Sequence, residues 1–287
     1  MANLNPSSDI SSFINTIFEQ AVLVARDNNV MTGLVRTFND RQGLATRQNS
    51  QYGGMTINTI AETDDLVGQQ FLPASIATLT PAEAGGQYFL TDNRVKSDPF
   101  AVRNDAAADM GQAMATKIET DLLGNFTSFT GGTIGTAGSA NSWSYFFAME
   151  TILRAQKAPY PYFYVCHPYQ WYPLSKAASV AGTRTNASNN FLDELRQSMF
   201  FVHQVGGVFI YTSANISIDG SGDAVSGMFS RDALALDVRT APYIEPERNA
   251  SRRGWELNMS STYGHGVWRP TFGVKGTFDA TAPDGTS

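Results

Sequence analysis

Charge is scarce in this 287-residue chain. Lys, Arg, Asp and Glu make up 16% of the residues, against about 25% in an average globular domain. The net charge is −6, so the chain lacks the basic surface that tight, sequence-independent binding of nucleic acid requires. A surface this poor in charge instead favours contact with other protein molecules.

Cysteine and long apolar runs are scarce too. Cys166 is the single cysteine, so no internal disulfide can form, and the disulfide-rich class of secreted proteins is excluded. The sequence has no window of about 18 apolar residues, and its N-terminus has no basic segment followed by an apolar one. We therefore expect neither a membrane span nor a signal peptide.

Patterns typical of catalysis or metal binding are missing as well. His167, His203 and His265 are far apart and have no acidic or Cys partner at metal-ligand spacing. Cys166 and His167 are adjacent in an expected strand, so their side chains point to opposite faces and cannot easily meet; we expect a buried structural thiol. Gly131–Gly138 lacks the Lys-Ser/Thr of a phosphate-binding loop, and we interpret it as a flexible loop. The sequence predicts no catalytic residue, metal ligand or cofactor, and hence no enzyme.

Two long β-runs dominate the last sixty residues. Residues 231–245 and 255–278 alternate apolar and polar side chains, which is typical of half-buried antiparallel strands. The polar stretch 246–254 joins them. Both runs far exceed the usual strand length of about 5–6 residues. The alternation changes phase at Arg269 and Pro270, and proline cannot donate a ladder hydrogen bond, so we expect a bend that divides the second run into two strands.

The first β-run has two unlike faces, and a charged segment follows it. One face carries Leu234, Leu236 and Val238, and the other carries Ala233, Ala235, Asp237 and Arg239. At the end of the run and just after it, Glu245 and Glu247 stand beside a group of arginines, Arg248, Arg252 and Arg253. We interpret this group as a charged strand tip available for salt bridges between subunits. Asp64 and Asp65 are a second acidic pair, in a turn-like segment.

Apolar residues at three- and four-residue spacing predict helices at 9–28, 104–123, 143–157, 169–178 and 190–200. The strongest is 104–123, with Asn104 or Asp105 as N-cap and Gly124 as C-cap, and with a length of about 30 Å. Its expected apolar face consists of Ala106, Ala107, Met110, Ala113, Met114, Ile118 and Leu122, while Glu119 belongs to the polar remainder.

Shorter strands fill the rest of the chain. Residues 33–98 contain no convincing helix, and strands at 34–38, 55–61 and 88–90 favour a long extended hairpin over a disordered insert. Strands at 162–166 and 208–211 alternate with helices, which predicts a compact α/β lobe over about 130–225.

The order of these parts resembles that of the major capsid proteins of tailed bacteriophages, with their HK97-type fold. Residues 95–99 leading into the helix 104–123, residues 165–169, residues 231–235 and the tail 255–270 carry the resemblance. It covers nearly the whole chain. It implies an α+β, HK97-like capsid fold with an N-terminal arm (1–33), an extended E-loop hairpin (34–92), a P-domain with a spine helix (93–129), a compact α/β A-domain (130–228), and return strands to the P-domain with a C-terminal tail (229–287).

The resemblance implies a structural function. Such a subunit self-assembles into hexamers and pentamers that form an icosahedral shell around viral DNA, in the virion, after assembly in the host cytoplasm. Only about thirty residues precede the expected E-loop, and the chain starts at Met1, so we expect a separate scaffolding protein besides a portal and a possible decoration protein. Lys96 is the only lysine before the spine helix, so we expect no covalent crosslink between subunits.

Two alternatives remain open at this point. The same fold serves encapsulin-like compartment shells, which enclose protein cargo rather than DNA. A soluble β-rich binding module or enzyme is the third reading, and it requires a pocket with converging polar groups. The sequence shows no such group of residues.

Overall fold

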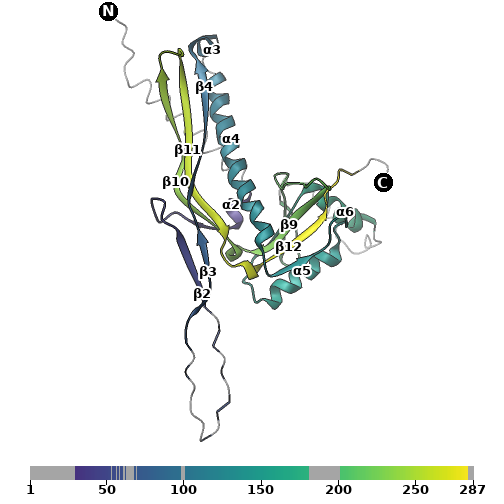
Figure 1. Cartoon of the computed structure of the whole chain (residues 1–287). Helices are drawn as coiled ribbons and strands as arrows, with labels where there is room; N and C mark the ends of the chain where they lie inside the picture. Colours follow the sequence, from purple (N-terminus) through teal and green to yellow (C-terminus); the bar gives the residue numbers. More distant parts are fainter. Residues whose placement is uncertain are drawn as a thin grey trace, which may run out of the picture.

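The computed structural model describes residues 30–52, 54, 55, 57, 59, 60, 62, 68, 70–97, 101–180 and 201–283. An elongated half and a compact lobe lie side by side, and a hairpin extends away from both (Figure 1). Helices and sheets are both well represented, which confirms the predicted α+β class. The helices expected at 9–28 and 190–200, and the pair Asp64 and Asp65, lie outside the described residues. Within them, no helix is long and apolar enough to span a membrane.

The elongated half is a four-stranded sheet in the order β1-β10-β11-β4. The long strands β10 (Leu234–Asn249) and β11 (Gly254–Val267) pair antiparallel, as predicted. The turn between them is shorter than expected, because β10 continues through part of the polar stretch 246–254. Arg248 donates to Asp92 and to the carbonyl of Gly254, and these bonds hold the polar end of β10 in the sheet.

Two further strands complete this sheet. β1 (Arg36–Phe38) lies parallel to the base of β10, and β4 (Ala82–Thr91) pairs with β11 over ten residues. The strand expected at 88–90 is therefore only the end of β4. Its first half contains Ala, Glu and Gly, which have low strand propensity, and pairing with β11 overrides that propensity.

The compact lobe is built on a six-stranded sheet in the order β5-β12-β9-β6-β8-β7. β6 (Tyr162–Cys166) is buried along its whole length, as predicted, between β8 (Val208–Thr212) and β9 (Asp223–Ser230). β7 (Phe201–Val205) forms one edge. The predicted helices α5 (Trp143–Ala155) and α6 (Pro168–Val180) pack on this lobe.

The end of the chain crosses from one sheet to the other. A short 3-10 turn, η4 (Pro270–Phe272), separates β11 from β12 (Gly273–Asp279), which confirms the bend expected near Pro270. β12 pairs with β9 and with β5 (Gly132–Ile134) in the lobe. We had expected the last strand to join the long sheet, and this expectation is wrong, because β12 belongs to the sheet of the lobe. The loop expected at 131–138 is only partly correct: residues 132–134 form β5 in the sheet, residues 135–138 are a loop, and a Cβ at Gly131 would lie 2.5 Å from the Thr271 carbonyl oxygen.

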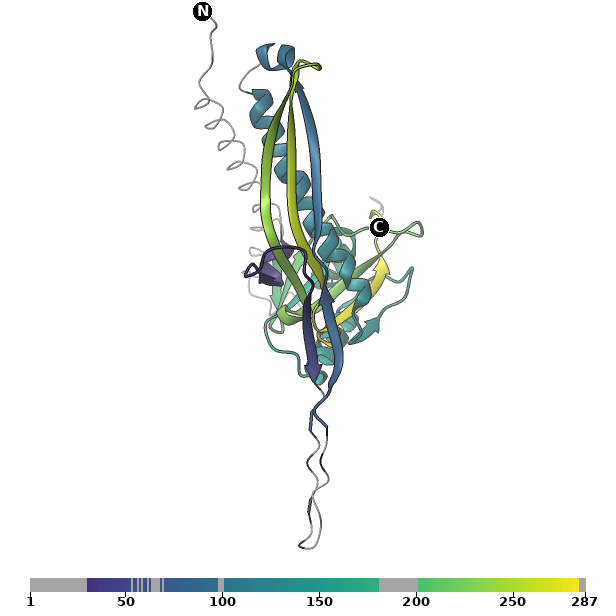
Figure 2. The same ribbon diagram turned by 60° about the vertical axis from the view of Figure 1, so that its left-hand side comes forward.

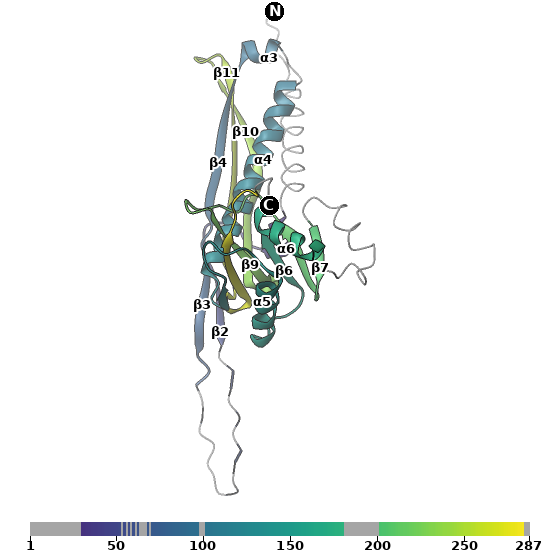
Figure 3. The ribbon, with the colours of Figure 1, turned by 90° about the vertical axis from the view of Figure 1, so that its right-hand side faces the viewer.

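The long helix α4 (Ala101–Gly124) packs against one face of the long sheet (Figure 3). It begins three residues earlier than predicted, so Asn104 and Asp105 lie inside its first turns. It also runs directly into a 3-10 turn, η1 (Asn125–Ser128), and Gly124 is helical with φ −58° rather than a C-cap.

The buried face of α4 is wider than predicted, since Ala115 and Leu123 are buried as well, and two further positions, Ala113 and Glu119, are reversed. Ala113 is exposed, whereas Glu119 is 1% exposed. The Ser213 hydroxyl and the Val30 amide donate to the two carboxylate oxygens of Glu119, so a charge expected in solvent instead joins α4 to two distant segments.

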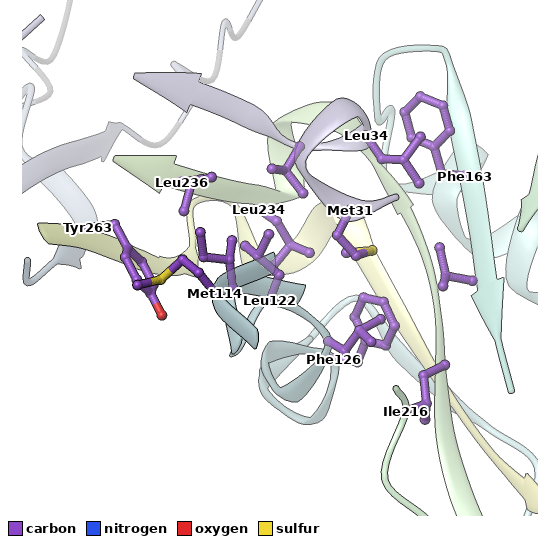
Figure 4. Close-up of a cluster of buried hydrophobic side chains, with 14 of the residues drawn as sticks. Met31, Leu34, Met114, Leu122, Phe126, Phe163, Ile216, Leu234, Leu236 and Tyr263 are labelled. Atoms are coloured by element: carbon purple, nitrogen blue, oxygen red, sulfur yellow. The ribbon is translucent and has the colours of Figure 1, made fainter. Parts of the chain in front are cut away.

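One core cluster joins the elongated half to the lobe. It includes Met114 and Leu122 from α4, Leu234 from β10, Tyr263 from β11 and Phe163 from β6 (Figure 4). Because its side chains come from both sheets, the two halves share a hydrophobic core.

The extended hairpin consists of β2 (Arg47–Tyr52) and β3 (Pro73–Leu79), which form a sheet of their own. It continues from the base of the long sheet (Figure 2). The hairpin prediction is confirmed, but none of the described residues between 55 and 61 is in a strand. Two short helices, α2 (Met31–Leu34) and α3 (Asp92–Ser97), begin and end a region in which we expected none.

Candidate functional site

Exposed apolar side chains gather on the hairpin. Their exposed fractions lie between 52% and 86%, and they comprise Tyr52, Met55, Ile57, Ile60, Phe71, Leu72 and Ile76. The rings of Tyr52 and Phe71 stack with centres 4.2 Å apart. Burying one such side chain contributes roughly 1.5–3 kcal/mol, and a two-stranded hairpin has no interior in which to bury them. This apolar hairpin surface is typical of a site for another protein.

A groove of about 510 Å³ lies between β4, β11 and α4. Its lining is mostly small or apolar: Ala84, Gly85, Gly86, Met110, Ala113, Met114 and Met259, with Glu83, Gln87, Tyr88 and Lys117 as its polar members. A Cβ at Gly86 would meet no atom within 4 Å, so the groove is open there. β4 is also an edge strand of its sheet, with backbone groups available on one side. We call this surface the β4–α4 groove.

Four charged residues form a cluster where the hairpin meets the body. Arg47 Nε donates to Asp237 Oδ2 at 3.0 Å, and Arg239 Nη2 donates to the same oxygen at 2.8 Å. Arg47 also donates to Asp40, and this hydrogen bond lowers the pKa of the Asp40 carboxyl. Asp237 and Arg239 lie on the polar face of a strand expected to be half-buried, but the hairpin covers that face and buries both. We call these four residues the root cluster.

The charged tip contains both paired and unpaired groups. Arg248 donates to both carboxylate oxygens of Asp92, and Arg252 lies 3.5 Å from Glu256. Arg253, Glu245 and Glu247 are exposed and have no ion pair within the part of the chain that is described. Salt bridges from this tip to another subunit stay a prediction.

The histidines and the cysteine occupy separate structural positions. His167 is buried directly before α6, and its Nδ1 accepts from the Tyr169 amide at 3.2 Å. His203 lies in β7. Cys166 is fully buried, and burial raises the pKa of its thiol to about 12, so it is an inert structural thiol under ordinary conditions.

His265 belongs to a polar contact between α4 and β11 that the sequence did not predict. Asp121 accepts from the Tyr263 hydroxyl at 2.7 Å and from Lys117 Nζ at 2.6 Å, and His265 Nε2 lies 3.8 Å from it. Across the described residues, no group of three or more His, Cys, Asp or Glu side chains is arranged to hold a metal ion.

Sequence reasoning found the hairpin and the charged tip but missed the β4–α4 groove and the root cluster. The groove has no local signal, because it forms only where β4 and α4 lie beside each other on the long sheet. The root cluster has one weak signal: a charged pair, Asp237 and Arg239, on one face of a strand that is otherwise apolar or small.

Comparison with protein-family models matches residues 76–276 to a phage capsid protein family. Comparison with curated protein sequences finds no significant match. The capsid of cyanophage P-SCSP1u is similar in structure, with a TM-score of 0.69 at 14% identity over 88% of this chain and 89% of that chain. The capsid of cyanophage Pam1 has a TM-score of 0.66 at 12% identity over 87% and 89%.

A virus-like particle is similar in structure as well. The virus-like particle from Pyrococcus furiosus has a TM-score of 0.60 at 11% identity over 92% of this chain and 98% of that chain. At such identities the solved structures show a shared fold, whereas the family match covers more than half of the chain and is to phage capsids, which makes the encapsulin-like alternative less favoured. The chain therefore belongs to the phage capsid protein family and is a shell-forming major capsid subunit with the HK97-like fold.

Proposed function

We propose that the chain closes into hexamers and pentamers by inserting its apolar hairpin surface into the β4–α4 groove of a neighbouring copy. The observation that carries this proposal is the exposure of the hairpin's apolar side chains, which only another molecule can bury. The β4–α4 groove is the matching surface for the hairpin. It is hollow and mostly apolar, and it is formed by another part of the same chain. Contacts between unlike surfaces of identical subunits close into rings when the rotation permits.

The parts of the subunit take the following assignments in this proposal. The N-terminal arm is 1–33, the E-loop 34–92, the P-domain 93–129 with α4 as spine helix, the A-domain 130–228, and the return strands and tail 229–287. Strand pairing favours two adjustments, with β4 counted in the P-domain and β12 in the A-domain.

Further partners follow from the shell function. The shell encloses viral DNA without reading its sequence, consistent with a net charge of −6. A separate scaffolding protein, a portal and a possible decoration protein assist assembly in the host cytoplasm before the subunit resides in the virion. The subunit acts structurally, without a catalytic site, a cofactor or a covalent crosslink.

A single charge in the groove tests the docking. Ala113 is an exposed position of α4 in the groove wall, so Ala113→Glu leaves the subunit folded and places a carboxylate where apolar side chains dock. We expect the yield of rings and shells in electron microscopy to fall at least about tenfold. Even if the new carboxylate pairs with Lys117 one turn away, docking strips its hydration, and that cost exceeds the roughly 1.4 kcal/mol that a tenfold change requires.

Thr116→Glu is the matched control, because Thr116 is exposed on the same helix and does not line the groove. It should assemble as the unmodified chain does. Normal assembly of the Ala113→Glu protein would contradict docking in this groove, and an unmodified chain that remains monomeric in every condition would contradict the shell function itself. Packaged DNA with a portal at one vertex, rather than protein cargo, distinguishes a phage head from a compartment shell.

A further inference from the structure

The hairpin meets the body through contacts that reach both of its strands. On the β2 side, the Arg47 guanidinium lies 4.2 Å from the centre of the Phe38 ring, besides its bond to Asp237. Arg239, on the body, donates to the Ala45 carbonyl at 2.8 Å as well as to Asp237. A single carboxylate therefore binds one guanidinium from the hairpin and one from the long sheet.

The β3 side is held by packing. Leu79 is fully buried at the end of β3 against Ala235 and Trp268. The Gln51 side chain, on β2, donates to the Trp268 carbonyl at 2.7 Å. The hairpin is thus attached at its root by both ionic and apolar contacts.

The ionic part of this attachment contributes geometry more than stability. Asp237 is 0% exposed, and a buried ion pair loses about as much solvation as it gains in attraction. Arg239 Nε and Nη1 have no hydrogen-bond partner in the described part of the chain, so the cluster is not saturated with bonds. A planar guanidinium facing a fixed carboxylate does, however, define an orientation.

Orientation matters because a small rotation at the root of the hairpin causes a large displacement of its far end. The six residues of β2 span about 20 Å, so a rotation of about ten degrees at Arg47 displaces the far end of β2 by about 3 Å. That displacement is comparable to the full length of a hydrogen bond and moves the more distant apolar side chains still further.

We infer that the root cluster positions the hairpin: the contact of Arg47 and Arg239 with Asp237 sets the direction in which β2 and β3 leave the body, and thereby the geometry of docking on the neighbouring copy. Arg47 is a positioning residue, since it acts through the hairpin and lies away from the apolar docking surface. The inference rests on the proposed docking of the hairpin.

The test measures hairpin direction in the unassembled full chain. Spin labels at Ser50→Cys on β2 and Gln112→Cys on α4, both exposed positions, report one distance, and the buried Cys166 does not react. Arg47→Lys keeps the charge but loses the planar guanidinium. We expect the mean distance to shift or the width of the distance distribution to increase at least about twofold. Arg248→Lys is the control, because Arg248 binds Asp92 at the opposite end of the long sheet, away from the root cluster.

Asp40→Asn provides a second variant that does not endanger folding, because the Asp40 side chain is 61% exposed. It removes one contact of Arg47 and should broaden the distribution less than Arg47→Lys does. Distributions that match the unmodified chain in both variants would overturn the inference. A broadened distribution combined with shells of normal yield and diameter would support the positioning role and refute the docking on which the proposed function depends.

Discussion

Burial of His167 and His265 makes the stability of the subunit depend on pH. Burial lowers the pKa of both imidazoles below the ordinary value of 6.5, for His265 despite the nearby Asp121. The unfolded chain therefore takes up these protons first as the pH falls. The stability that the neutral rings provide is complete above about pH 6.5 and is lost as the pH falls through their folded-state pKa values.

We expect the free energy of unfolding of the isolated subunit to decrease as the pH falls from about 7 through the lowered pKa values of the two imidazoles. The slope is at most about 1.4 kcal/mol per pH unit for each proton taken up. Denaturant titration followed by circular dichroism measures it, and His265→Gln should reduce it. Asp121 has a pKa lowered below 3.8 and so contributes only to a later loss at more acidic pH. An unchanged slope in the His265→Gln protein would show that His265 does not contribute.

At the scale of elements, the seam between β4 and β11 depends on two adjacent glycines with different surroundings. A Cβ at Gly85 would lie 2.6 Å from the Met259 carbonyl oxygen, a backbone atom that cannot move freely. A Cβ at Gly86 would enter the open groove. The close approach at Gly85 explains how an edge strand with few apolar residues stays paired over ten positions.

Gly85→Ala should therefore lower the free energy of unfolding by about 1–3 kcal/mol, because the strands must separate to admit the methyl group. Gly86→Ala should be neutral or stabilise the subunit by about 0.4–1 kcal/mol, since alanine restricts the unfolded chain. Thermal unfolding of the two variants in parallel measures the difference. Equal stability of both would mean that β4 and β11 are not packed as closely as described.

At the scale of the whole molecule, the elongated half, the lobe and the hairpin each leave surfaces that a single subunit does not cover. The two halves are nevertheless joined by one core that runs from α4 and the long sheet into the lobe (Figure 4). Folding of one subunit and association of many are thus served by different surfaces, a buried core for the first and the hairpin and groove for the second.

Deletion of residues 1–28, the predicted amphipathic helix, should impair shell assembly more than folding. The described core begins with Met31, which is fully buried and is retained in the shortened chain. We expect a change of less than about 1 kcal/mol in the free energy of unfolding, as for changes away from a core. Electron microscopy and thermal unfolding of the same preparation check both halves of the prediction. Normal shells from the shortened chain would contradict the arm assignment.

Elements with a strong local period were predictable. The long strands, α4 and α5 each follow a run of apolar residues at a fixed spacing, β6 is a continuous apolar run, and Pro270 interrupts the spacing where the chain changes sheets. These signals need no knowledge of the partner, because one buried face is enough to impose the pattern.

Contacts between distant segments were not predictable. Arg47 and Asp237 are 190 residues apart, and Glu119 and Ser213 are 94 apart. β5 begins with Gly132, is flanked by Gly131 and Gly135, and has little apolar character, so nothing local indicates that β12 pairs with it.

The sequence by itself determined which segments are helices or long strands, that an extended hairpin interrupts them, and that no catalytic pattern is present, because periodicity and residue type act locally. Only the tertiary structure decided that β12 leaves the long sheet for the lobe, that Glu119 and Asp237 are buried charges, and that a groove opens beside β4. Those features depend on which surfaces meet, and a buried charge is stable only where the fold supplies its partner.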